Sequence, residues 1–221
     1  MRIRKDGEET RGRILLAALQ VFGEKGYRDA THAEICLRAG VNTAAINYHF
    51  GSKRGLYQAT WEDATARADA LYPIDGGVDR DAPPEERLLG LVRAFLQRRA
   101  DEKQLGYLHN IRMMELVNPT GLLEQAIDLA HNKTRASFRG VLRELLGSEA
   151  TKADLEMCEM SVMSQCILAY KKKGKGAWSF KPDSVDVLAK HIVRFCLAGI
   201  AAVQRETESP RDGASRKAAN V

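Results

Sequence analysis

The sequence predicts an all-α protein with a small N-terminal domain of three helices and a larger helical C-terminal domain. Apolar residues recur every three or four positions over most of the 221 residues, and no stretch alternates apolar and polar residues as a half-buried strand does. No internal repeat is evident. With 44% hydrophobic residues, the chain can bury one sizeable core and a small appended domain.

The first predicted helix supports the small domain. It spans Thr10 to Lys25, because apolar residues recur there at helical spacing, and Gly26 ends it. The residues that carry this spacing are Ile14, Ala18, Val21 and Phe22.

A second helix follows within the stretch from Thr31 to Tyr57, which has the form of a helix-turn-helix. Thr31 and Glu34 form a capping box that starts this helix. Gly40 ends it, because glycine reaches the left-handed conformation without a steric penalty. The residues that we expect it to bury are Ala33, Ile35, Leu37 and Ala39.

The third helix is short and carries mostly small and polar side chains. Asn42 is positioned to cap it, and it spans Thr43 to Phe50, about two turns. Ile46 and Phe50 lie four residues apart and should pack inward. The side chains expected to point outward are Thr43, Ala44, Asn47 and Tyr48. A short helix with such an outer face fits the major groove of DNA.

A fourth helix begins with two cations. Gly51 closes the third helix, Ser52 caps the fourth, and Lys53 and Arg54 lie in its first turn. Cations oppose the positive end of a helix dipole, whereas a bound phosphate would be favoured there. We therefore interpret Lys53 and Arg54 as contacts to the DNA backbone.

These residues carry a resemblance to a known family. The run from Gly26 through Tyr48, His49 and Phe50 to Ser52, Lys53, Gly55 and Leu56 resembles the N-terminal domain of TetR/AcrR-type transcriptional repressors. The resemblance covers roughly Thr10 to Ala59. The sequence INYHFGSK is similar to that of members of the branch with CecR-like C-terminal domains. It implies an all-α fold in which a three-helix helix-turn-helix domain binds DNA. A larger C-terminal helical domain would then provide ligand binding and dimerisation.

The resemblance also implies roles for single positions. Thr31, Tyr48, His49 and Lys53 match phosphate-contacting or neighbouring positions, and Thr43–Asn47 match the base-reading segment. The expected DNA-binding residues are Thr31, Asn42, Thr43, Ala44, Ala45, Asn47, Tyr48, His49, Lys53 and Arg54. The sequence departs from the family pattern at three of these positions. Asn42 replaces the usual serine or threonine cap, Asn47 stands where an aromatic residue is common, and Arg54 replaces a frequent glutamate.

The remaining sequence predicts that the C-terminal domain, which we call the body, is helical. After a long helix from Lys53 to Leu71, the segment Tyr72–Pro84 is rich in Gly, Pro and Asp and must be a loop. The further helices are expected at Glu85–Ala100, Gly106–Val117, Gly121–Leu146, Asp154–Lys172 and Asp183–Arg205. The predicted domains are residues 1–52 for DNA binding, 53–206 for effector binding and dimerisation, and 207–221 as a disordered tail.

The last two helices carry apolar stripes with two possible partners. The stripes consist of Leu155, Cys158, Val162, Gln165 or Cys166, and Ala169, and of Val185, Leu188, Ile192, Phe195 and Gly199. They suit a four-helix bundle with a second copy of the chain, but equally a core of their own. A homodimer is favoured because one two-turn recognition helix reads only a few base pairs.

An effector pocket is expected in the body because the resemblance implies one. Its candidate residues are Tyr107, His109, Met113, Met114, Phe138, Met160 and Met163, since flexible thioethers and aromatic rings suit apolar ligands. His109, Arg112 or Glu115 could orient a polar end of the ligand. Core packing explains the methionines equally well, and a histidine such as His109 is more often structural than a ligand contact.

Charge and composition narrow the function. The chain has 34 basic and 29 acidic residues, a net charge of +5, and residues 1–60 hold ten basic and six acidic residues. The excess is therefore concentrated in the region proposed to bind DNA. No apolar run is long enough to span a bilayer, so the protein should be cytoplasmic. We find no motif for catalysis, a metal or a cofactor, which argues against an enzyme.

The four cysteines lack metal-ligand spacing and lie among apolar neighbours. We interpret them as buried reduced thiols, with a redox switch using Cys158 and Cys166 as the alternative. The expected function is a ligand-responsive transcriptional repressor that binds a palindromic double-stranded operator as a homodimer and is released by a small-molecule effector. The alternative is a DNA-binding regulator controlled by a protein partner or by cysteine oxidation.

Overall fold

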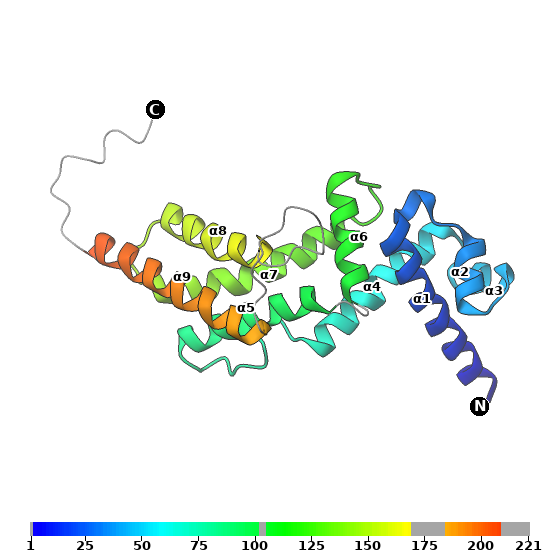
Figure 1. The fold of residues 1–221 in the computed structure, drawn as a ribbon, viewed down its shortest axis with the longest axis horizontal. Helices are drawn as coiled ribbons and strands as arrows, with labels where there is room; N and C mark the ends of the chain where they lie inside the picture. The colour runs from blue at the N-terminus through cyan, green and yellow to red at the C-terminus, as the bar shows by residue number, and fades with distance from the viewer. Residues whose placement is uncertain (1, 102–104, 169–183, 209–221) are drawn as a thin grey trace. The chain divides into compact units, whose positions relative to one another are not determined.

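The fold is all-α, as predicted. A computed structural model describes residues 2–101, 105–168 and 184–208, and these residues form nine helices and no strand (Figure 1). The helices are α1 (Arg2–Asp29), α2 (His32–Ala39), α3 (Thr43–Phe50), α4 (Lys53–Leu71), α5 (Pro84–Ala100), α6 (Leu105–Val117), α7 (Glu124–Leu146), α8 (Lys152–Leu168) and α9 (Val185–Glu208).

Most predicted helix limits hold within three residues. The first helix differs most, because α1 begins at Arg2 and continues past Gly26, whose φ of 79° interrupts the helical backbone where the end was predicted. At the other end of the chain, α9 extends three residues beyond the predicted Arg205. The expected continuation of α8 to Lys172 and the rest of the predicted tail, residues 209–221, lie outside the described residues.

The first compact unit comprises residues 1–73 and 97–132. Within it α1 contacts α2, α4 and α6, and the buried face of α1 has the apolar spacing that the sequence indicated. Gly23 makes the contact with α6 possible, because a Cβ atom there would lie 2.7 Å from the Cβ of Tyr107. Helices α1, α4 and α6 therefore form the frame that supports α2 and α3.

The second compact unit comprises residues 74–96 and 133–221. Its core gathers residues from α5, α7, α8 and α9, among them Leu88, Val92, Phe138, Leu142, Cys166 and Ala189. The division into these units does not coincide with the predicted boundary at residues 52 and 53, because α4 and α6 pack in the unit that contains α2 and α3. The functional division into DNA-binding and effector-binding domains stays a prediction.

The interpretation of the two stripes as a dimer surface is wrong for most of their residues. Leu155, Cys158, Val162 and Cys166 are buried in the core of the second unit, and Ile192 keeps only 2% of its surface exposed. Among the stripe residues, Phe195 and Gly199 are exposed, Phe195 by 65%, and Ala169 lies outside the described residues. The large apolar residues that the two helices do expose form what we call the outer stripes: Met157, Met160, Ile167 and Leu168 on α8, and Val187 and Phe195 on α9.

Candidate DNA-binding site

The caps predicted for α2 and α3 are confirmed. The Thr31 hydroxyl accepts from the Glu34 amide at 3.2 Å, and the Asn42 side-chain oxygen accepts from the Ala45 amide at 3.0 Å. Between the helices Gly40 takes the left-handed conformation, with φ 64° and ψ 42°. Local hydrogen bonds and one glycine thus set the turn that orients α3.

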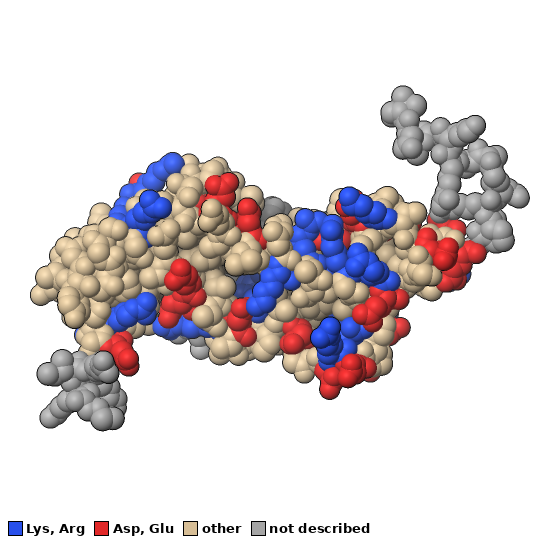
Figure 2. Space-filling view, turned by 180° about the vertical axis from the view of Figure 1, so that it is seen from behind, with Lys and Arg blue, Asp and Glu red and all other residues tan. Residues whose placement is uncertain are grey.

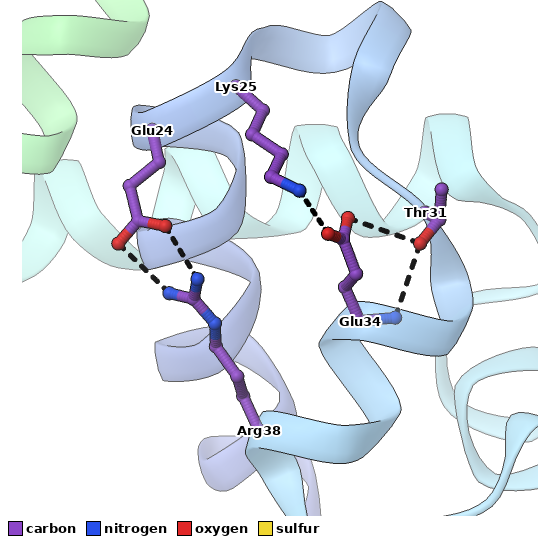
Figure 3. Close-up of polar contacts among 5 residues, drawn as sticks. All are labelled: Glu24, Lys25, Thr31, Glu34 and Arg38. Carbon is purple, nitrogen blue, oxygen red and sulfur yellow. Dashed lines mark hydrogen bonds and ion pairs between the residues drawn. The ribbon is translucent and has the colours of Figure 1, made fainter.

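Two ion pairs fasten α2 to α1 (Figure 3). Arg38, in the last turn of α2, donates to both carboxylate oxygens of Glu24 at 3.0 and 2.6 Å. Lys25 donates to Glu34 in the first turn of α2. The hydrogen bond from Arg38 lowers the pKa of Glu24, and the one from Lys25 lowers the pKa of Glu34. The pairs are partly exposed, so their main effect is to fix both ends of α2 rather than to add much stability.

The prediction for the buried side of α2 is wrong at two positions. Leu37 is 84% exposed and Ala33 is not buried either, whereas Ile35, Cys36 and Ala39 are buried. The predicted set repeated every two residues, which is the period of a strand. A helix buries residues three or four apart, and the observed set follows that rule.

The outer side of α3 presents uncharged hydrogen-bonding groups, as predicted. Thr43, Ala44, Asn47 and Tyr48 are exposed, and we call these four residues the α3 face. Ile46 is buried, and Phe50 is half-buried beneath the Arg11 guanidinium, 5.4 Å from its ring centroid. No Asp, Glu, Lys or Arg lies between Thr43 and Phe50, and the surface over α2 and α3 is largely tan in the view of Figure 2. Such a surface can approach base edges without charge repulsion or a strong preference for phosphate.

Ala45 and His49 are less accessible than the α3 face. Both belong to the set predicted to contact DNA, and the His49 ring lies 5.0 Å from that of Tyr48 and 6.0 Å from that of Phe50. Tyr48 is 85% exposed, the largest exposure among the large apolar and aromatic side chains of α3. The Thr31 hydroxyl is already engaged in the cap and also donates to Glu34 at 3.2 Å.

Lys53 has a structural contact that the sequence did not indicate. Its ammonium donates to the Arg28 carbonyl at 3.1 Å and lies 4.8 Å from the centroid of the Tyr27 ring. A cation at the C-terminal end of α1 is favourable by itself, so phosphate is not the only explanation for Lys53. An ammonium has three donors, and the Arg28 carbonyl takes one of them. Arg54 is exposed beside it.

A buried hydrogen-bond network holds α4 against α6. The Tyr57 hydroxyl donates to Glu115 at 2.7 Å, and the same carboxylate accepts from the Thr120 amide at 2.9 Å and the Thr120 hydroxyl at 2.8 Å. Burial, together with this hydrogen bond, raises the pKa of Tyr57. Outside this buried network, Arg28 of α1 donates to Asn118, the residue after α6, in an exposed hydrogen bond of 2.6 Å. Glu115 is therefore committed to its own neighbours, which makes it a poor candidate for orienting a ligand.

The seven candidate pocket residues fall in both compact units. Tyr107, His109, Met113 and Met114 lie on α6 in the first unit, while Phe138, Met160 and Met163 lie on α7 and α8 in the second. Tyr107 packs against Gly23, and Met114 lies near Gly26. Phe138 is buried in the second core, where Met163 packs, and Met113 and Met160 are exposed. Neither unit contains all seven residues, and the pocket stays a prediction.

The cysteines are buried, as predicted. Cys36, Cys158, Cys166 and Cys196 are all free thiols. Burial raises the pKa of Cys158 and of Cys196, which lowers the thiolate fraction that an oxidant would attack. Within residues 2–101, 105–168 and 184–208, no group of three or more His, Cys, Asp or Glu side chains is placed to hold a metal ion. None of the described helices is long and apolar enough to cross a membrane.

Known proteins match both parts of the chain. Residues 14–60 match the family described as bacterial regulatory proteins, tetR family, and residues 84–200 match the C-terminal domain of the HTH-type transcriptional dual regulator CecR. The chain is 37% identical over 75 residues to the HTH-type transcriptional regulator SrpR of Pseudomonas putida, covering 34% of this chain and 35% of SrpR. It is 51% identical over 53 residues to the dual regulator CecR of Shigella flexneri, covering 24% of this chain and 23% of CecR.

The matched segments span about a third or less of the length of these curated relatives. A solved structure extends the likeness of the fold over most of the chain. It is a TetR-like transcriptional regulator from Rhodococcus sp. RHA1, with a TM-score of 0.63 and 18% identity, covering 87% of this chain and 96% of that one.

Proposed function

This chain belongs to the TetR/AcrR family of transcriptional regulators, and from that premise we propose that it is a repressor released by a small-molecule effector. It binds a palindromic operator as a homodimer. Its place of action is the cytoplasm, where the chromosome of a bacterium is accessible to such a regulator.

The composition of the α3 face is the observation that carries the DNA-binding part of the proposal. Asn47 offers a carboxamide with both a donor and an acceptor, the pair of groups that matches the N6 and N7 edge of adenine. Thr43 adds a hydroxyl, and Ala44 adds a methyl that suits contact with thymine. Lys53 and Arg54 begin the next helix, where phosphate contacts would fix the register of α3 on the duplex.

The outer stripes support the homodimer. Six large apolar side chains are exposed on α8 and α9, and they recur at helical spacing rather than singly. Soluble proteins seldom leave such stripes in water, so a second copy is the partner that we propose for them. Two copies related by a twofold axis would read two half-sites in inverted order, which is why the operator is proposed to be palindromic.

The packing of α6 supports release by an effector. Helix α6 contacts α1 through Gly23 and Tyr107 and contacts α4 through Tyr57 and Glu115. Helices α1 and α4 in turn hold α2 and α3. A ligand that binds better when α6 is displaced would therefore shift the population away from the DNA-binding arrangement.

Selection from random duplex DNA by the purified full-length protein tests the proposal. The expected product is a palindrome with half-sites about one helical turn apart, bound by a species with twice the mass of one chain in light scattering. A site without inverted symmetry, bound tightly by a monomer, would overturn the homodimer. Failure to enrich any sequence would overturn specific DNA binding.

A further inference from the structure

The C-terminal end of α3 is covered by a cation from α1. The Arg11 guanidinium lies 5.4 Å from the centroid of the Phe50 ring, and Phe50 is the last residue of α3. The His49 ring lies 6.0 Å from that of Phe50 and 5.0 Å from that of Tyr48, which is 85% exposed. Arg11 therefore lies at the end of α3 from which the exposed Tyr48 projects.

The guanidinium of Arg11 has no acceptor in the part of the protein that the structure describes. Arg28 and Arg38, in the same unit, each donate to an oxygen, whereas Arg11 makes neither a hydrogen bond nor an ion pair with a described residue. Glu8 stands three positions before it, a spacing at which ion pairs form on helices, but Arg11 lies over the Phe50 ring instead. A guanidinium that covers a ring keeps the N–H groups at its edge available to another acceptor.

A role in stability alone leaves these donors unused. A cation over an exposed ring, near the negative end of a helix dipole, is favourable, but each contribution is small where water and salt screen the charge. Phosphate is the acceptor that suits the group, because two N–H groups of a guanidinium match two phosphate oxygens. DNA is the source of phosphate that the position favours, since Arg11 lies at one end of the helix that carries the α3 face.

We propose that Arg11 binds a phosphate of the DNA backbone and holds the C-terminal end of α3 on the duplex. The segment from Thr43 to Phe50 contains no Lys or Arg, so the cations that neutralise the phosphates beside α3 have to come from other helices. Lys53 and Arg54 of α4 are two of them in the proposed function, and Arg11 adds a third from α1. This inference rests on the DNA binding of the proposed function, and it gives α1 a contact to DNA beyond its support of α2 and α3.

The salt dependence of binding to random duplex DNA tests the contact without an operator. Arg11→Gln should weaken binding about tenfold or more at low salt and reduce the slope of log K against log salt by about 0.9 for each chain bound. Arg11→Lys keeps the charge and should keep the wild-type slope, with a smaller loss of affinity because an ammonium lacks the planar fork. Arg143→Gln, at an exposed arginine on α7, makes the same change in net charge and should bind like the wild type. A wild-type slope for Arg11→Gln would overturn the phosphate contact.

Unfolding of the same variants separates DNA binding from stability. Arg11→Gln should keep the wild-type circular dichroism and change the melting temperature only slightly, because the residue is exposed. Arg11→Met, which keeps a long side chain over the Phe50 ring without a charge, is a second uncharged variant and should show the same reduced slope. A lower melting temperature with an unchanged slope in both variants would assign Arg11 to packing on Phe50 and not to DNA.

Neutral phosphates locate the contact on the selected operator. A methylphosphonate at one position removes a single negative charge and leaves the base sequence intact. A scan of one half-site should find a position that weakens binding by the wild type and by Arg11→Lys but not by Arg11→Gln, because Arg11→Gln has already lost that contact. The same set of sensitive positions in the wild type and in Arg11→Gln would contradict the proposal.

The outcome is separable from the proposed function. If the wild type selects no operator, the specific binding of the proposed function fails, while the slope on random DNA still decides the role of Arg11. If an operator is selected and Arg11→Gln matches the wild type in slope and in sensitive positions, the Arg11 contact fails alone.

Discussion

The α3 face and the outer stripes are both exposed, but they suit opposite kinds of partner. The α3 face offers a hydroxyl, a methyl, a carboxamide and a phenol. The outer stripes offer thioethers, aliphatic chains and the Phe195 ring. Hydrogen-bonding groups gain specificity from a polar partner such as base edges, whereas large apolar groups gain free energy by leaving water. Exposure alone therefore does not identify a binding surface, and the chemistry of the exposed groups does.

The largest expected effect is the loss of the dimer on changing Phe195 to Asp. A carboxylate in an apolar interface is strongly unfavourable, so the variant should be monomeric in light scattering and should lose more than about a hundredfold in affinity for the full palindrome. Phe195→Leu, which keeps an apolar side chain, is the control and should stay dimeric. A dimeric, tightly binding Phe195→Asp protein would place the interface elsewhere.

Changing Ile192 to Asp as well distinguishes a residue of the core from a residue of the outer stripes. Ile192 is 2% exposed, so an aspartate there should unfold the second unit rather than only separate two copies. Circular dichroism should show a decrease in helix for Ile192→Asp and native helix content for Phe195→Asp. Native helix content in both variants would mean that Ile192 does not support the core.

A smaller effect, confined to sequence preference, is expected at Asn47. Asn47→Ala should cost roughly 1–3 kcal/mol on the preferred operator and relax selection at one position per half-site. Binding to random DNA should be unchanged, because the contact is to a base. If selection with the variant returns an unchanged site, Asn47 does not read bases.

Lys53 should affect all DNA sequences alike. Lys53→Ala should weaken specific and nonspecific binding together and reduce the dependence of log K on log salt by about 0.9 for each phosphate that the variant no longer neutralises. Thermal unfolding of the same sample measures how much the hydrogen bond from Lys53 to the Arg28 carbonyl contributes to stability. A lower melting temperature with an unchanged salt slope would assign Lys53 to capping α1 and not to DNA.

The smallest effect is expected at Leu37, where sequence and structure disagree. Leu37→Ala should change the free energy of unfolding by less than about 0.5 kcal/mol, because the side chain is exposed. Ile35→Ala, two residues away, should cost about 2–5 kcal/mol because it leaves a cavity. Similar destabilisation at both positions in denaturant unfolding would contradict the observed orientation of α2.

The sequence predicted best what depends on neighbouring residues. The caps at Thr31, Asn42 and Ser52 and the left-handed Gly40 each involve groups no more than four residues apart, so their chemistry can be recognised without a fold. The caps also predicted where α3 begins, and from that start the helical period predicted which of its residues point outward.

Contacts between distant segments were not predictable in this way. Periodicity indicated that α8 and α9 have apolar faces, but it could not say whether their own core or another chain covers them. The bond from Lys53 to Arg28 and the one from Tyr57 to Glu115 join residues 25 and 58 positions apart. The position of Lys53 at a helix start suggested a phosphate partner. The partner that it contacts, the Arg28 carbonyl, belongs to another helix, so the local sequence could not indicate it.

The close approach of α1 and α6 restricts how this chain can vary in evolution. A methyl group at position 23 would meet not only the Cβ of Tyr107 but also its Cα, at 2.9 Å. Every amino acid has a Cα, so no replacement of Tyr107, however small, restores the space. A protein in which Gly23 is replaced must therefore hold the two helices further apart. A second substitution that compensates for the loss has to lie at a position that moves the α6 backbone.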